Sequence, residues 1–159
     1  MLHSMAEFLA HAIALEAHSA ERFEALANAL EARSETAVSE LFRRMAQYSR
    51  LHLEEVRTAA GSLTLPAYRQ EDYLWPDAEP PETIPAHCEQ TGITPKQALL
   101  EALRSEERGE AFYAAVAATT TDSAVRHLAE EFAAEESGHV SMLSQWLVSL
   151  PDHGAPPSR

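Results

Sequence analysis

The residues of this sequence best suited to chemistry are glutamates and histidines at helical spacing. Glu136 and His139 form a Glu-x-x-His pair, and i, i+3 spacing on a helix aims both side chains at one point. We followed each helical stretch in alternating steps of four and three residues, the period of a buried bundle stripe. Among apolar residues, these stripes contain Glu16, His52, Glu106, Glu136 and His139.

Carboxylates in such positions need a partner. An unpaired carboxylate in an apolar core costs several kcal/mol, and three close together also repel one another. None of the twelve lysines and arginines lies on these stripes. A divalent cation would offset the charge, and mixed carboxylate and imidazole ligands suit iron, manganese or zinc better than magnesium or calcium.

The positions of proline indicate the elements that carry these residues. Residues 1–65 and 96–150 contain no proline and are rich in Ala, Leu and Glu, which favour helix. Cap-type residues mark the starts: Ser34, the capping box Thr94-Pro95-Lys96-Gln97, and Asp122. We therefore predict helices over residues 4–32, 34–60, 95–119 and 122–149.

The connections predict how these helices pack. Short turns near residues 33 and 121 make two antiparallel hairpins, and the Pro-rich segment 61–94 is long enough to cross the length of a bundle. Its Tyr68, Tyr73, Leu74 and Trp75 are expected to lie against the helices. Two hairpins joined by one long crossover form the ferritin-like variant of the all-α four-helix bundle.

The two hairpins also repeat one pattern. A shift of 90 residues aligns Leu9 with Leu99, Glu16 with Glu106 and Phe23 with Tyr113, and a shift of 87 aligns Met45 with Phe132 and His52 with His139. The chain is therefore interpreted as an internal duplication of a helical hairpin.

Composition limits the function classes. The chain has 159 residues, a mass of 17.5 kDa and a net charge of −13, which argues against binding to nucleic acid or to an anionic membrane. It has one cysteine, Cys88, no signal-peptide pattern and no run of about 18 apolar residues. We expect one cytoplasmic domain over residues 1–150, followed by a flexible tail over 151–159.

With these residues in place, the sequence resembles the ferritin-like di-iron carboxylate superfamily, and within it the rubrerythrin-type domain. The resemblance implies that Glu16 and Glu106 are terminal ligands, Glu136 a bridging carboxylate, and His52 and His139 the two imidazoles. Each of the first two glutamates is followed seven residues later by an aromatic residue, as in that family. It also implies two iron ions, with manganese or zinc as alternatives, and a homodimer or larger assembly.

The sequence departs from that family in three places. Ser49 stands at the expected bridging glutamate of the second helix, and Gly109 at a further glutamate of the third. The single cysteine leaves no four-cysteine rubredoxin-like domain. Glu55 and Glu110 are candidate substitute ligands or solvated side chains, Ser49 could hold a water, and Tyr113 is a core residue whose hydroxyl could bond a ligand carboxylate.

Other polar residues have simpler interpretations. His11, His18, His87, His127 and His153 show no convergent spacing and are predicted at the surface, and Glu130, Glu131 and Glu135 are predicted to form a solvated face.

Three functions fit the sequence: an oxidoreductase whose metal pair reacts with dioxygen or peroxide using an external electron donor, a protein that binds and oxidises ferrous iron, and a degenerate bundle with one metal or none that acts as a binding or structural module.

Overall fold

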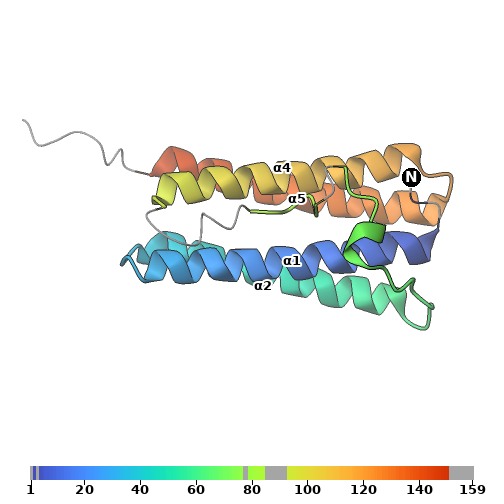
Figure 1. Cartoon of the computed structure of the whole chain (residues 1–159). Coiled ribbons are helices and arrows are strands. Elements are labelled where there is room, and N and C mark those ends of the chain that lie inside the picture. Colours follow the sequence, from blue (N-terminus) through green and yellow to red (C-terminus); the bar gives the residue numbers. More distant parts are fainter. Residues whose placement is uncertain (1, 3, 77–78, 85–92, 151–159) are drawn as a thin grey trace, which may run out of the picture.

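The computed structural model describes residues 2, 4–76, 79–84 and 93–150. These residues form four long helices, α1 (Met5–Glu31), α2 (Thr36–Ala60), α4 (Pro95–Thr119) and α5 (Ser123–Ser149), and a short 3₁₀ turn, η1 (Gln70–Asp72). Figure 1 shows the helices side by side, with α2 and α4 both starting at the same end of the bundle. The all-α, ferritin-like arrangement of two hairpins is therefore confirmed. The predicted tail, residues 151–159, lies outside the described residues.

Local sequence signals explain most of the helix starts. Thr94 and Gln97 form the predicted capping box of α4, and the Asp122 carboxylate accepts hydrogen bonds from the backbone N–H groups of Ala124 and Val125. The prediction that Ser34 caps α2 is wrong. Ser34 has a φ of 64° in the turn, and α2 begins one residue after Glu35, which makes no side-chain cap. The reversal of direction after α1 needs this left-handed residue more than it needs a cap.

The crossover is fixed to the bundle by its backbone. The Leu74 N–H donates to His11 Nε2 on α1 at 2.9 Å, and Arg108 on α4 donates to the carbonyls of Pro81 and Thr83 at 2.7 and 2.6 Å. Trp75 is buried as expected, but the Leu74 side chain is exposed. The crossover therefore contacts both hairpins.

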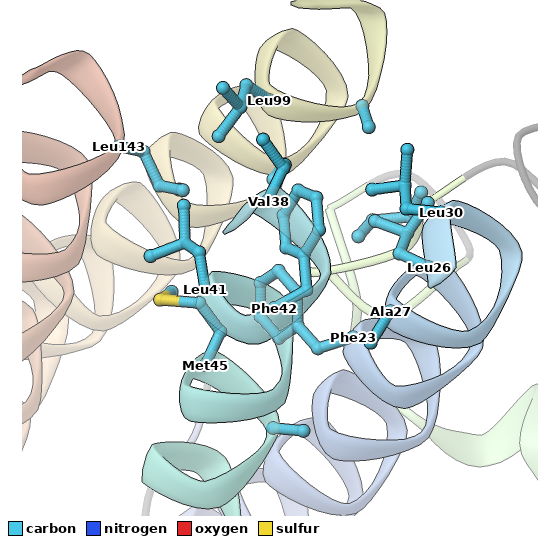
Figure 2. Close-up of a cluster of buried hydrophobic side chains, with 14 of the residues drawn as sticks. Phe23, Leu26, Ala27, Leu30, Val38, Leu41, Phe42, Met45, Leu99 and Leu143 are labelled. Atoms are coloured by element: carbon cyan, nitrogen blue, oxygen red, sulfur yellow. The ribbon is translucent and has the colours of Figure 1, made fainter. Parts of the chain in front are cut away.

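Two apolar clusters fill the bundle at different heights. One contains Phe23, Leu30, Phe42, Leu99 and Leu143. Figure 2 shows the side chains of this cluster pointing toward one another from the surrounding helices. The other contains residues from the opposite end: Phe8, Leu9, Val56, Tyr113 and Phe132. In each long helix the predicted site residues lie between a member of one cluster and a member of the other. The polar site is therefore closed at both ends by apolar packing.

Among the described residues, none of the helices is long and apolar enough to span a bilayer.

Candidate metal centre

The structure brings all five sequence-predicted residues together at mid-height in the bundle. Glu16 on α1, Glu106 on α4 and Glu136 on α5 are buried, each with at most 2% of its surface exposed. His52 on α2 and His139 on α5 each keep 14% of their side chain accessible. Each helix supplies at least one of these side chains, because the stripes of the four helices meet along the bundle axis.

These residues form two three-residue groups whose donor atoms lie within 4.8 Å of one another. One group is Glu16, His52 and Glu136, and the other is Glu106, Glu136 and His139. Glu136 belongs to both. A carboxylate has two oxygens, so one shared glutamate between two groups of oxygen and nitrogen donors is the arrangement expected of a bridged metal pair.

The two groups differ in how tightly they are held. His139 Nδ1 lies 2.9 Å from Glu106 Oε2 and 3.1 Å from Glu136 Oε2. His52 Nδ1 lies 3.8 Å from Glu16 Oε2, and its Nε2 lies 3.5 Å from Glu135 Oε2. The two imidazole rings are stacked, with centroids 5.4 Å apart and planes 16° from parallel. The α4–α5 side is therefore the more compact one.

Burial and mutual repulsion shift the acid groups of the site. Burial raises the pKa of Glu16 and of Glu106 well above the usual range, and the charge of Glu136 raises both further. Burial also disfavours the ionised form of Glu136, but hydrogen bonds with His139 and Glu106 outweigh it and leave this pKa lowered.

The imidazole of His139 responds in the opposite sense. Burial lowers its pKa, but the hydrogen bond and charge of Glu136 outweigh burial and raise it. These shifts favour the ionised form of Glu136 and the protonated form of His139, and they disfavour ionisation of Glu16 and Glu106. A divalent cation would allow all three carboxylates to be charged together.

The donor set fits a transition metal. Carboxylate and imidazole ligands suit iron, manganese or zinc. Oε1 of Glu106 is buried and has no hydrogen-bond partner among the described residues, so one oxygen of the site is left for a ligand outside the protein.

The predicted surrounding residues have separate outcomes. Tyr113 is fully buried, and its hydroxyl donates to Glu16 Oε1 at 3.2 Å. Ser49 is buried with its Oγ 3.2 Å from Ser19 Oγ and 3.3 Å from the Met45 carbonyl oxygen. Glu55 is exposed and Glu110 half-buried, and neither belongs to a three-residue group.

The prediction that His11 lies at the surface is wrong. His11 is fully buried: its Nδ1–H donates to the Glu7 carbonyl at 2.8 Å, and its Nε2 accepts from Leu74. His18 is half-buried and lies 3.3 Å from the Thr83 hydroxyl. The crossover covers this part of α1, which a helical stripe alone does not show. His127 is exposed as predicted, and His87 and His153 lie outside the described residues.

The predicted solvated face of α5 needs a smaller correction. Glu130 and Glu131 are exposed, but Glu135 is half-buried and its carboxylate contacts His52. Glu135 lies next to Glu136 in the chain, so two successive acids of α5 lie near His52.

Among the residues that the structure describes, sequence reasoning missed one buried carboxylate. Glu82, in the crossover, has 2% of its surface exposed. It lies in a segment with no helical period, so no stripe contains it. The available signal was Gly109, a glycine at a bundle position of α4, because Glu82 packs against it.

Comparison with known proteins agrees with this geometry. A family model described as Rubrerythrin matches residues 7–85, which cover most of α1, all of α2 and most of the described crossover. The crystal structure of an uncharacterized conserved protein from Magnetospirillum magnetotacticum MS-1 is 37% identical, with a TM-score of 0.81, over 97% of this chain and 100% of that one. No curated protein gives a significant match.

Proposed function

This chain belongs to the rubrerythrin family of ferritin-like proteins, and on that premise we propose that its buried cluster is a di-iron centre that reacts with dioxygen or peroxide or oxidises ferrous iron. The observation that carries the proposal is the pair of three-residue groups sharing Glu136. Manganese and zinc are alternatives for the same ligands.

In this proposal each side chain has a separate part. Glu16 and His52 hold one side of the centre, Glu106 and His139 hold the other, and Glu136 joins the two. When bound, the iron pair supplies one-electron chemistry and Lewis acidity toward the oxidant. The protein supplies the geometry: carboxylates can change between one and two bound oxygens without moving the helices.

Residues around the cluster orient these ligands. The hydroxyl of Tyr113 donates to Glu16 Oε1, and burial together with the charge of Glu16 raises the pKa of Tyr113, so this hydroxyl stays protonated as a donor. Tyr48 stacks on the His139 ring with centroids 5.6 Å apart. The apolar clusters lie on both sides of the centre along the bundle axis.

A second candidate function rests on Ser49. In the internal repeat Ser49 occupies the place of Glu136, so the α1–α2 hairpin lacks a bridging carboxylate of its own. If this loss leaves one metal or none, the bundle would serve as a binding or structural module. Metal stoichiometry separates the two candidates.

The test is metal content per chain. The purified protein is loaded anaerobically with ferrous iron, freed of excess and analysed by elemental analysis. We expect about two ions per chain. About one ion would favour the single-metal module, and none would contradict the metal centre.

A second experiment addresses the chemistry. The loaded, reduced protein is mixed with peroxide or with dioxygen, and the change in iron absorption is followed by stopped flow. Repeated turnover with an added reductant supports the oxidoreductase, whereas one oxidation per iron followed by its release or storage supports ferrous iron oxidation.

A further inference from the structure

The crossover places one glutamate inside the bundle by holding the backbone on both sides of it. Arg108 on α4 donates through Nε to the Pro81 carbonyl at 2.7 Å and through Nη2 to the Thr83 carbonyl at 2.6 Å. A turn between Pro80 and Thr83, with an N–H to carbonyl distance of 3.1 Å, closes the same segment. Glu82 lies between these anchored carbonyls and is buried. Its position is therefore fixed by the backbone and not by chance packing.

The helices leave room for this side chain at two matching positions. A Cβ added to Gly109 would overlap Glu82 Oε1 and lie 3.1 Å from its Cγ and Cδ. The residue 90 positions earlier, Ser19 on α1, hydrogen-bonds the Glu82 carboxylate. Glycine is the least favourable ordinary residue inside a helix after proline, so its use here is explained by the space Glu82 needs.

Glu82 also connects to the place where the α1–α2 hairpin lacks a carboxylate. Ser49 Oγ lies 3.2 Å from Ser19 Oγ, and Ser19 bonds Glu82. One carboxylate from the crossover therefore touches Gly109 directly and reaches Ser49 through one hydroxyl.

The charged groups that act on Glu82 are the glutamates of the candidate metal centre. Burial raises its pKa well above the usual range, and the charges of Glu136, Glu106 and Glu16 raise it further. Its Oε1 has no hydrogen-bond partner among the described residues. Burying a fourth carboxylate beside three others is unfavourable unless a cation offsets their charge.

We infer that Glu82 is a further metal ligand, supplied by the crossover to the centre formed by the four helices. It lies outside the two three-residue groups, so ligation requires a change in its side-chain torsions, and its Oε1 has no hydrogen-bond partner among the described residues to oppose that change. Glu82 thereby adds the fourth carboxylate that the repeat loses at Ser49. This inference rests on the proposed metal centre.

The test compares Glu82→Gln with Glu79→Gln. Both remove one acid from the same crossover segment, but Glu79 is exposed. Iron content after anaerobic loading, and cobalt(II) affinity measured by competition with a chelator, are determined for both variants and for the unaltered chain. We expect Glu79→Gln to have the same metal affinity as the unaltered chain. In Glu82→Gln we expect the affinity for the more weakly bound ion to fall at least about tenfold.

Thermal unfolding separates a ligand from a structural residue. Without metal, Glu82→Gln is expected to unfold at the same or a higher temperature, because it removes a buried acid. With cobalt(II) its stabilisation should be smaller than that of the unaltered chain. Loss of stability without metal, with unchanged cobalt(II) affinity, would overturn the inference in favour of a structural role.

A second pair of variants reaches the same point without altering Glu82. Gly109→Ala should displace Glu82 and weaken cobalt(II) binding to a similar extent, and combining it with Glu82→Gln should add little. Gly138→Ala on α5 is the matched control, since a Cβ there meets nothing within 4 Å.

The outcomes distinguish this inference from the proposed function. If the unaltered chain binds no metal, the metal centre and the role of Glu82 both fail. If it binds metal and the Glu82→Gln and Gly109→Ala variants bind equally well, only the role of Glu82 fails.

Discussion

The two helical hairpins of this protein share a pattern but do not offer the same donors. The α4–α5 hairpin provides Glu106, Glu136 and His139 in one compact group. The α1–α2 hairpin provides Glu16 and His52 but has Ser49 where its counterpart has Glu136. The α4–α5 hairpin thus contributes a complete three-residue group, whereas the group that contains Glu16 and His52 takes Glu136 from α5. The repeat therefore matches the positions of these side chains more closely than their chemistry.

The same divergence affects the residues that cover the imidazoles. Tyr48 on α2 and Glu135 on α5 are equivalent in the repeat. Tyr48 stacks on His139, and Glu135 contacts His52 at 3.5 Å. An apolar ring shields one histidine and a half-buried carboxylate faces the other. The two histidines therefore have different neighbours, an aromatic ring beside His139 and a half-buried carboxylate beside His52.

The largest expected effect comes from removing the residue that both halves share. Glu136→Gln should reduce iron content from about two ions per chain to near zero, because each three-residue group loses a charged ligand. Glu131→Gln, on an exposed part of the same helix, is the control. Elemental analysis after anaerobic loading provides the measurement. Retention of one ion by Glu136→Gln would mean that one of the two groups holds its ion without Glu136.

Restoring a carboxylate at position 49 should make the two hairpins more alike. Ser49→Glu places a further acid among buried carboxylates, so the metal-free protein should lose a few kcal/mol of unfolding free energy. With metal, the affinity of the α1–α2 side for its ion should rise at least about tenfold. Urea unfolding without metal and chelator competition with cobalt(II) test the two halves of this expectation. Unchanged affinity would show that Ser49 does not limit the site.

A smaller effect is expected at the aromatic residues that follow Glu16 and Glu106 by seven positions. Tyr113 and Phe23 are equivalent in the repeat, but only Tyr113 bonds a site carboxylate, Glu16. Tyr113→Phe makes the two positions alike and removes one buried donor, so it should cost about 1–3 kcal/mol of unfolding free energy. The ion on the Glu16 side should bind more weakly, while the one on the Glu106 side should not change. Equal weakening of both ions would indicate a general packing defect.

The site residues that could be predicted from sequence lie in helices, and those that could not depend on the irregular crossover. Glu16, Glu106 and Glu136 could be located because a helix repeats every 3.6 residues, so an acid among leucines on one stripe must face the core. Ligation by these residues stays a prediction, but their convergence was found as expected. Glu82 and the burial of His11 could not be found in this way. Both depend on where the crossover lies, and an irregular segment has no period from which its inward side can be deduced.

The smallest expected effect concerns His11, which the crossover covers on α1. Its counterpart in the repeat, Glu101, is half-buried and pairs with Arg104 at 2.6 Å, whereas His11 is enclosed by Tyr68, Tyr73 and Trp75. Burial lowers the pKa of His11 below its ordinary value of 6.5, against the opposing effect of Glu7, so folding favours the neutral ring.

The sign of its pH dependence follows from this shift. As pH falls through 6.5, the unfolded chain takes up a proton at His11 more readily than the folded one, so folding loses stability toward acid. His11→Gln keeps a donor and an acceptor but cannot titrate. Between pH 7.5 and 5.5, in metal-free protein, the unaltered chain should lose more unfolding free energy than His11→Gln, as measured by urea titration. Equal losses would mean that His11 is protonated in the fold, and that the crossover is bound to α1 more loosely than the buried ring indicates.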